Sequence, residues 1–320
     1  MARPLVIQTE DLDPRPAAWL AERCELVRCA ADGPGFFGLL ARAEGLIVRT
    51  YTRVDDAMLA AAPRLRVVGR AGVGVDNIDV AACAARGVAV VNTPGANTRA
   101  VVEFVAAAML DVLRPRAALD RPLPPDEWNR LRKSLEAERE IAGLTLGVLG
   151  LGRIGSQVAR LGAALNMRVI YHELREIDHA DRHGAEPVPL DDLLAAADVL
   201  SVHVDARPSN RALLGPSAFA RMKPDALLIN TSRGFVVDGG ACAAYLRANP
   251  RAFAVLDVFD PEPPGSSCPL WGLPNARLTP HVAGATRHAK REMSWVVRDV
   301  WRVLTGEAPE HTVTPDSPSC

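Results

Sequence analysis

The chain has 320 residues, a length typical of about two domains. Its hydrophobic fraction of 48% and charged fraction of 23% are those of an ordinary globular protein and exclude disordered or collagen-like chains. The formal net charge of −1 gives no overall field that would attract nucleic acid or an anionic membrane. The first residues have no apolar signal-peptide core, and no apolar run is long enough for a membrane span, so we expect a cytoplasmic protein.

Short apolar segments alternate with helical patterns along most of the chain. The first series predicts strands over 5–9, 25–29, 45–50, 66–71 and 88–93. The second series predicts strands over 145–150, 168–173, 199–204, 226–230, 253–258 and 277–279. Continuous apolar strands separated by helices are typical of parallel sheets covered on both faces. We therefore predict an α/β fold with two doubly wound parallel-sheet domains.

Two long helical patterns connect the series. The segment 98–113 leads from the first series towards the second. A pattern from residue 282 onward returns the chain, with an apolar stripe formed by Met293, Val296, Val297, Val300 and Leu304. We expect residues 1–98 and 285–320 to form one discontinuous domain, into which residues 99–284 are inserted.

The segment 114–142 differs from its surroundings. Four prolines are followed by a charged helical pattern over 126–140. We interpret this segment as an exposed arm at an interface between subunits. From Thr312 onward we expect a frayed tail.

The segment 150–155 has the pattern GxGxxG, made by Gly150, Gly152 and Gly155. It follows a predicted strand and opens a helix, and Glu173 ends the next predicted strand, which together form the context of a dinucleotide site. The first glycine permits the tight turn, the second lets the backbone approach the pyrophosphate, and the third lets helix and strand pack closely. The helix N-terminus would face the phosphates with its positive end. A glycine-rich turn without a ligand is the alternative, which this context disfavours.

The carboxylate of Glu173 predicts which dinucleotide is bound. It would accept hydrogen bonds from the adenine-ribose hydroxyls and repel a 2′-phosphate, so the sequence favours NAD over NADP. Arg175, two residues on, is a signal in the opposite direction. We expect residues 99–284 to be an NAD-binding Rossmann domain.

Seven segments occur in an order that is typical of a known family. They are GLIVR (45–49), VVGRAGVGVDNID (67–79), VVNTPGANTRAVVEF (90–104), TLGVLGLGRIG (145–155), INTSRG (229–234), LDVFDPEP (256–263) and LTPHVAG (278–284). On these segments the chain resembles the D-isomer-specific 2-hydroxyacid dehydrogenases, and within them the phosphoglycerate dehydrogenase branch. The resemblance runs from about residue 5 to residue 305. It implies that the Rossmann NAD domain is inserted into a flavodoxin-like substrate-binding domain.

The family resemblance implies a catalytic Arg-Glu-His set, which falls on Arg233, Glu262 and His281. Hydride transfer at C2 of a 2-hydroxy acid requires a group that holds the carboxylate and a group that exchanges a proton with the C2 oxygen. The arginine fork suits the first task, and a histidine with a pKa near neutrality suits the second. The glutamate would orient the ring and stabilise the imidazolium. Taken singly, each residue has a bland alternative in a structural histidine, a surface arginine or a solvated carboxylate.

The resemblance also implies cofactor contacts outside the glycine motif. It assigns Asp257 to the nicotinamide amide. Backbone groups would line the cofactor at Arg153, Ile154, Thr231, Ser232 and Gly284. After the strand that ends at His203 the branch usually has Thr-Pro, whereas this chain has Val204 and Asp205. Val204 therefore occupies a cofactor-contact position without the hydroxyl. The other histidines and the cysteines lack metal spacing, so we expect no metal.

The substrate-binding candidates lie mainly in the first series of strands. The turn that contains Val73 and Gly74 would bind the substrate carboxylate through backbone N–H groups. Arg49 and Arg70 end neighbouring predicted strands, and arginines in these two motifs contact the substrate phosphate in the phosphoglycerate branch. Arg130, in the arm, would reach in from the partner subunit. The alternative is arginine bias, because all but three of the 37 basic residues are arginine.

The leading functional hypothesis is an NAD-dependent D-2-hydroxyacid dehydrogenase, in its narrower form one that oxidises 3-phosphoglycerate in the first committed step towards serine. A reductase of hydroxypyruvate, glyoxylate or another 2-keto acid would use the same catalytic set. A third hypothesis is an NADH-sensing, corepressor-like protein, which would bind NADH without turnover. We expect a homodimer with a small 2-hydroxy or 2-keto acid as its ligand, and no nucleic-acid or membrane partner. The chain ends soon after the returning helix, so we expect none of the regulatory domains that some phosphoglycerate dehydrogenases append.

Overall fold

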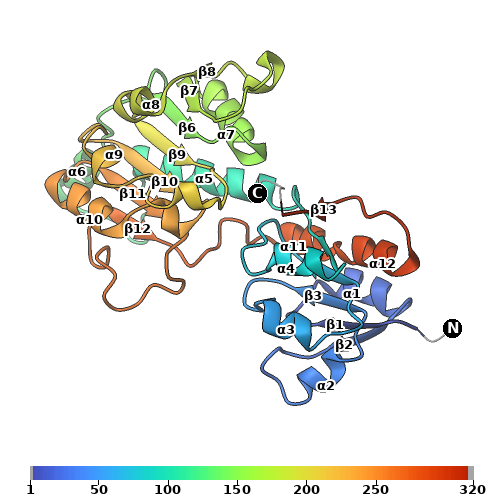
Figure 1. The fold of residues 1–320 in the computed structure, drawn as a ribbon. Helices are drawn as coiled ribbons and strands as arrows, with labels where there is room; N and C mark the ends of the chain where they lie inside the picture. The colour runs from blue at the N-terminus through green and yellow to red at the C-terminus, as the bar shows by residue number, and fades with distance from the viewer. Residues whose placement is uncertain (1–2, 316–320) are drawn as a thin grey trace. The chain divides into compact units, whose positions relative to one another are not determined.

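The computed structural model describes residues 3–315 and divides the chain into two compact units (Figure 1). Unit 1 comprises the described residues up to Thr98 and those from Gly284 onward. Unit 2 comprises Arg99–Ala283. Gly284, which we expected at the end of the inserted domain, falls in unit 1. The two parallel-sheet α/β units confirm the predicted fold class.

Unit 1 contains a six-stranded sheet in which only the terminal strand is antiparallel. In order across the sheet the strands are β13 (Thr312–Val313), β5 (Ala89–Val91), β4 (Val67–Arg70), β3 (Gly45–Val48), β1 (Leu5–Gln8) and β2 (Glu25–Arg28). The parallel strands follow the flavodoxin-like order 2-1-3-4-5. The order of the strands therefore reverses between β1 and β3, where such sheets place their ligand crevice.

Helices cover both faces of the unit 1 sheet. They are α1 (Pro14–Ala21), α2 (Phe36–Leu40), α3 (Asp56–Ala60), α4 (Val80–Ala85), α11 (Arg287–Ser294) and α12 (Val297–Thr305). On one face, Leu20 of α1 and Val300 of α12 pack with Val6 and Ile47. The opposite face is covered by α2, α3 and α4. Successive residues of a strand point to opposite faces, so a wholly apolar strand fills both cores.

Unit 2 contains a seven-stranded parallel sheet. In order across the sheet the strands are β12 (Ala276–Leu278), β11 (Phe253–Leu256), β10 (Leu227–Asn230), β9 (Val199–Val202), β6 (Thr145–Leu149), β7 (Arg168–His172) and β8 (Glu186–Pro187). Here the order reverses between β6 and β9, so the predicted crevice of this unit lies at their carboxyl ends.

The helices of unit 2 also divide between the two faces. They are α5 (Thr98–Leu113), α6 (Pro125–Ser134), α7 (Arg153–Ala164), α8 (Leu190–Ala196), α9 (Pro216–Phe219) and α10 (Gly239–Ala248), with short 3₁₀ turns η1 (His179–Arg182), η2 (Pro208–Asn210) and η3 (Gly234–Val236). One apolar core joins α5 and α7 to the sheet, and a second joins α8, α9 and α10 to the other face. Among residues 3–315, no helix is both long and apolar enough to cross a bilayer.

Side chains at helix N-termini explain where many of the helices begin. Asp13, Asp55, Asp79, Asp238 and Thr286 each accept a hydrogen bond from a backbone N–H of the first turn that follows. Such caps satisfy donors that have no partner inside the helix. In contrast, α7 has no side-chain cap, because the residue before it is Gly152. The N-terminus of this helix can therefore take an acceptor from elsewhere.

Three sequence expectations need correction. The returning helix begins at Arg287, not at residue 282, because the N–H groups of Val282 and Ala283 donate to a buried carboxylate and Thr286 caps the helix. It is also interrupted between Ser294 and Val297.

The arm helix is shorter than predicted and ends at Ser134. Beyond it, Arg139 leaves the helical path and donates to Asp198 over 2.9 Å. The tail is ordered at Thr312–Val313, which pair with β5. Asp299 directs this segment by accepting the N–H groups of Glu310 and His311, over 2.8 and 3.1 Å.

Candidate active site

The glycine motif forms a tight turn at the end of β6, where the strand order of unit 2 reverses. Gly150 has a φ of 94°, and a Cβ there would lie 2.8 Å from the His203 carbonyl oxygen at the end of β9. A Cβ on Gly155 would lie 2.0 Å from the Gly150 oxygen, so this helix and strand can approach only without a side chain. At Gly152 a Cβ would meet nothing within 4 Å. The backbone there borders open space, as a phosphate cradle requires.

Glu173 lies directly after β7 and faces the glycine turn. Its Oε2 accepts the N–H of Leu151 over 3.1 Å, and its Oε1 accepts the N–H of Leu174 over 2.9 Å. The guanidinium of Arg175 lies close to this carboxylate, with its Nε atom 3.9 Å from Oε1. The carboxylate therefore stands at the end of β7, where the ribose of a dinucleotide lies in this type of fold.

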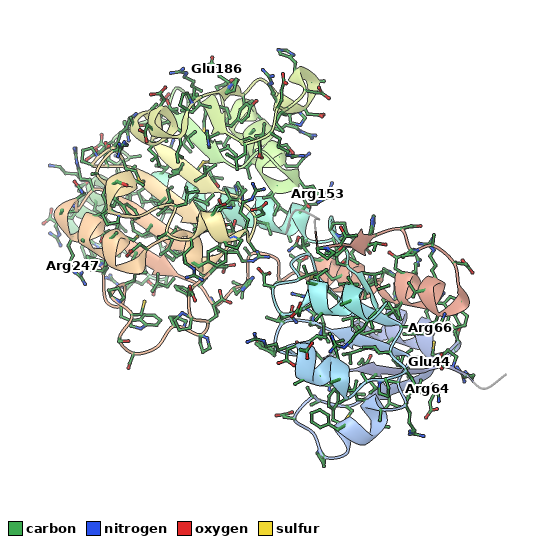
Figure 2. All side chains as sticks on the ribbon, viewed as in Figure 1. Glu44, Arg64, Arg66, Arg153, Glu186 and Arg247 are labelled. Atoms are coloured by element: carbon green, nitrogen blue, oxygen red, sulfur yellow. The ribbon has the colours of Figure 1, made fainter. Side chains whose placement is uncertain are left out.

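Two sequence-predicted cofactor positions flank this turn. Val204 follows β9 and lies against Gly150. Beyond it, Asp205 makes a two-point contact with the Nε and Nη2 atoms of Arg207. The hydrogen bonds to Asp205 raise the pKa of Arg207, and the charge of Glu173 adds a smaller effect in the same direction. Arg153 is exposed in the first turn of α7, and Figure 2 labels it at the edge of unit 2.

The end of β10 carries the segment Asn230–Arg233. Asn230 is fully buried, and its Oδ1 accepts both the N–H and the hydroxyl of Ser232, over 3.0 and 2.8 Å. Its Nδ2 donates to the carbonyl oxygen of Arg233 over 3.0 Å. This asparagine therefore fixes the turn that presents Arg233. The buried Oγ1 of Thr231 has no hydrogen-bond partner among the described residues, so it remains available to a ligand.

Gly234 brings the Arg233 turn against the segment that contains Glu262. A Cβ on Gly234 would lie 1.9 Å from the Phe259 carbonyl carbon, so only glycine allows this approach. The N–H of Phe259 in turn donates to Oε1 of Glu262 over 2.8 Å. The arginine turn and the glutamate therefore belong to one packed assembly.

Glu262 and His281 are directly paired. The distance between Glu262 Oε2 and His281 Nδ1 is 2.9 Å. The histidine side chain remains 49% exposed, so the ring is reachable from outside. Its backbone has a φ of 52°, a left-handed conformation that costs a non-glycine residue about 1–3 kcal/mol. Such a conformation persists only where the surroundings impose it.

The pair shifts the pKa of both partners. The hydrogen bond to Glu262 raises the pKa of His281 above its ordinary value, although burial and the charge of Arg233 act in the opposite direction. Burial would raise the pKa of Glu262, but hydrogen bonds from His281 and from the Phe259 N–H outweigh it and lower that pKa. At neutral pH the carboxylate is charged and favours the imidazolium.

Asp257 is fully buried directly after β11, and it binds the segment that carries His281. Its Oδ1 accepts the hydroxyl of Thr279 and the N–H of Val282, over 2.6 and 2.8 Å. Its Oδ2 accepts the N–H of Ala283 over 2.7 Å, and its carbonyl oxygen accepts the N–H of His281 over 2.9 Å. These contacts account for the left-handed backbone at His281. The structure thus gives Asp257 a positioning role that the sequence reasoning missed.

The remaining candidates lie in unit 1, at the ends of neighbouring strands. Register pairs Val48 of β3 with Arg70 of β4, so Arg49 follows its strand one position beyond the level of Arg70. The buried Nη1 of Arg49 has no hydrogen-bond partner in the described part of the chain. Arg70 Nη1 donates to the Ala71 carbonyl oxygen over 2.8 Å and lies over Gly72, where a Cβ would be 2.1 Å away.

The turn that contains Val73 and Gly74 is held from β5. The Nδ2 of Asn92 donates to the Val73 carbonyl oxygen over 2.7 Å, and Thr93 Oγ1 donates to the Gly72 carbonyl oxygen over 3.2 Å. Because the carbonyl groups are held in this way, the turn has a defined orientation.

Two predicted residues remain, one directly after the segment that carries His281 and one on the arm helix. Gly284 belongs to unit 1, where a Cβ would meet Asn97 Nδ2 at 3.0 Å. Arg130 is exposed on α6, a helix with no buried residue in the described chain. The structure brings Arg233, Glu262 and His281 together in unit 2, whereas Arg49 and Arg70 follow the ends of the neighbouring strands β3 and β4 in unit 1.

The sequence pointed to Asp257 only as a contact of the nicotinamide amide, and it gave no indication that Asp257 and Asn230 hold these groups in place. Asn230 and Asp257 are polar residues at the ends of apolar strands, and that position was their available signal. A buried polar group needs hydrogen-bond partners, and here the partners are the backbones of the two segments that carry Arg233 and His281.

Comparisons with known proteins identify the family of the chain. The family model described as "D-isomer specific 2-hydroxyacid dehydrogenase, NAD binding domain" matches residues 106–283. The chain is 39% identical to a D-3-phosphoglycerate dehydrogenase of Archaeoglobus fulgidus over 257 residues, which are 80% of this chain and 48% of that protein. It is 38% identical to a glyoxylate reductase of Aeropyrum pernix over 308 residues, covering 93% of this chain and 92% of that protein.

Solved structures give the same result. A D-lactate dehydrogenase of Aquifex aeolicus, complexed with NAD and lactic acid, superposes with a TM-score of 0.80 at 26% identity, covering 95% of this chain and 96% of that one. The chain spans about half the length of the Archaeoglobus phosphoglycerate dehydrogenase that it resembles. By family model, sequence and fold, this chain belongs to the D-isomer-specific 2-hydroxyacid dehydrogenase family and carries its NAD-binding domain.

Proposed function

We propose that the protein interconverts a D-2-hydroxy acid and the corresponding 2-keto acid with NAD as the redox partner. The observation that carries the proposal is the contact of 2.9 Å between Glu262 and His281, beside the Arg233 turn. These three side chains supply an acid–base pair and a cation within the unit that has the dinucleotide turn.

His281 is the residue that exchanges the proton. Its Nδ1 is engaged by Glu262, so Nε2 is the ring atom that can donate to or accept from the C2 oxygen of the acid. In keto-acid reduction Nε2–H donates its proton to that oxygen, and in hydroxy-acid oxidation neutral Nε2 removes it. Arg233 binds the carboxylate of the acid and polarises its C2 oxygen.

The NAD site is formed by residues that fit the cofactor. The turn at Gly150, Gly152 and Gly155 receives the pyrophosphate, and Glu173 accepts the ribose hydroxyls. The Thr231 Oγ1 atom, for which the described residues provide no hydrogen-bond partner, suits the nicotinamide end, together with Ser232. When bound, the cofactor would supply the redox chemistry, as hydride acceptor in its oxidised form NAD and as hydride donor in its reduced form NADH.

For the substrate we propose 3-phosphoglycerate. Arg49 and Arg70 stand within one position of each other at the ends of adjacent strands, and a phosphate is best bound by two or more guanidinium groups. The buried Nη1 of Arg49, which has no hydrogen-bond partner among residues 3–315, supports an anionic ligand. The alternative is hydroxypyruvate or glyoxylate reduction, which the likeness to a glyoxylate reductase supports. The same catalytic set serves both reactions.

The test is a substrate panel followed by NADH absorbance. We expect kcat/KM for 3-phosphoglycerate to exceed that for unphosphorylated glycerate by at least about tenfold, and Arg49→Ala to remove most of this difference. Arg64→Ala is the matched control, because Arg64 is an exposed arginine of the same unit (Figure 2). Equal use of glycerate and phosphoglycerate would contradict the phosphate assignment and favour the hydroxypyruvate or glyoxylate reaction.

We also propose that the protein is a homodimer joined through the arm. Trp128 of α6 and Leu119 before it are half exposed, and α6 buries none of its residues within the described chain. Analytical ultracentrifugation should give the mass of a dimer. Trp128→Asp should shift the mass towards that of a monomer, and an unchanged dimer would contradict the role of the arm.

A further inference from the structure

Four consecutive backbone N–H groups converge on a single carboxylate in unit 1. Glu10 lies just after β1, and the segment 49–52 lies just after β3. Glu10 Oε1 accepts the N–H groups of Arg49, Tyr51 and Thr52, over 3.0, 3.1 and 3.1 Å. Its Oε2 accepts the N–H of Thr50 over 2.9 Å. The contact spans the point where the strand order of this unit reverses, which is where such sheets bind ligands.

The same segment is held from its other side. Asn77 Nδ2 donates to the carbonyl oxygens of Arg49 and Thr52, over 3.2 and 2.6 Å. The hydroxyl of Thr52 donates to Thr9 Oγ1 over 2.6 Å. Every backbone N–H of the segment and the carbonyl groups at both its ends therefore have a side-chain partner. This is far more restraint than an ordinary surface loop has.

The chemistry of Glu10 fits this task. An ionised carboxylate has two oxygens with about four acceptor positions and no donor, so it can satisfy four N–H groups at once. Burial alone would raise the pKa of Glu10, but the four backbone hydrogen bonds outweigh burial and lower that pKa. Glu10 is therefore charged at neutral pH. A glutamine would offer one oxygen and would turn an NH₂ group towards N–H donors.

The effect on Arg49 is positional. Its recorded hydrogen bond to Glu10 is made by the backbone N–H, while the buried Nη1 atom has no partner in the described chain. The carboxylate thus fixes the main chain at Arg49 and leaves Nη1 available for an anion. A side chain whose backbone is fixed before the ligand arrives loses less conformational freedom on binding than one on a mobile loop.

We infer that Glu10 is a positioning residue for the substrate: by holding the segment 49–52 it presents Arg49 to the second anionic group of the acid. The inference rests on the substrate role proposed for Arg49. It predicts an effect on the affinity for the acid and none on hydride transfer or on NAD binding.

The experiment measures steady-state kinetics of Glu10→Gln with 3-phosphoglycerate and NAD. We expect KM for the acid to rise about tenfold, while kcat stays within about threefold and KM for NAD does not change. Asp56→Asn is the matched control, because Asp56 is an exposed carboxylate of the same unit that pairs with Arg86 instead. If Glu10→Gln does not fold, Asn77→Ala loosens the same segment from its other side and should also raise KM for the acid.

A double-mutant cycle separates the positioning role from a general structural one. In an Arg49→Ala background, Glu10→Gln should raise KM no further, because the residue through which it acts is gone. A full additional increase in KM would overturn the inference, as would unchanged KM in both Glu10→Gln and Asn77→Ala while Arg49→Ala raises it. An Arg49→Ala variant with unchanged KM for the acid would instead contradict the proposed substrate role of Arg49 itself.

Discussion

The carboxylate of Glu262 holds the ring of His281 by its Nδ1 atom at 2.9 Å, and it raises the pKa of that ring. The backbone beneath the ring is fixed separately, since three N–H groups from His281 to Ala283 donate to Asp257. The ring of His281 therefore depends on Glu262, and the backbone that carries the ring depends on Asp257. Mutation can separate these two effects.

The first prediction concerns the pH dependence of both directions. Keto-acid reduction needs protonated His281, so its rate falls as pH rises through the histidine pKa. Hydroxy-acid oxidation needs the neutral ring, so its rate rises through the same pKa. Glu262→Gln removes the charge that raises this pKa, and both limbs should move to lower pH. Profiles of kcat/KM in each direction measure the shift. Limbs that stay in place would show that Glu262 does not raise the pKa of His281.

The second prediction concerns the proton itself. His281→Asn keeps a side chain of similar polarity but cannot exchange a proton near neutral pH. We expect kcat to fall by about 10²- to 10⁴-fold, the usual contribution of a general acid–base group. Fluorescence titration should show NADH binding as in the parent. A kcat within a few-fold of the parent would assign His281 a structural role.

The third prediction concerns Asp257. In Asp257→Asn an NH₂ group would face one of the N–H groups that the carboxylate now accepts. Leaving buried donors without an acceptor should cost about 1–3 kcal/mol of unfolding free energy and lower kcat together with it. Urea unfolding and steady-state rates measure both. Asp238→Asn is the control, because that carboxylate caps α10 at a partly exposed site, where asparagine caps equally well. Equal behaviour of the two variants would remove the special role of Asp257.

The fourth prediction concerns cofactor choice. Glu173→Ser removes the charge that would repel a 2′-phosphate and leaves Arg175 and Arg207 nearby. The ratio of kcat/KM for NADP to that for NAD should rise at least about tenfold. Glu176→Ser, which removes an exposed carboxylate three residues on, should leave the ratio unchanged. A parent enzyme that already prefers NADP would contradict the assignment of Glu173.

Most of the fold could be predicted because its signals are local. Each segment expected to be a strand overlaps one in the structure, since continuous apolar runs between helical patterns are typical of buried strands. The strand Thr312–Val313 could not be predicted, because it depends on Asp299, which holds the backbone of residues 310 and 311. The helix Phe36–Leu40 was missed because it follows Gly35, which offers no side-chain cap to mark its start.

The candidate site likewise combines residues that local motifs predict with residues that no local pattern predicts. The glycine turn and the triad of Arg233, Glu262 and His281 occur in recognisable motifs. The residues that hold them act over long sequence separations: Asp257 binds N–H groups about 25 residues on, and Glu10 binds N–H groups about 40 residues on. No local pattern shows such partners, so these roles required the structure.

Hydride transfer at C2 of a D-2-hydroxy acid can be followed with an isotope. The D and L forms of each acid in the panel, labelled with deuterium at C2, are incubated with the enzyme and NAD, and the nicotinamide product is examined by mass spectrometry. We expect NADH that carries the deuterium with the D form of a turned-over acid and none with the L form. Unlabelled NADH, equal use of the L form, or NADH binding without turnover of any acid would contradict it.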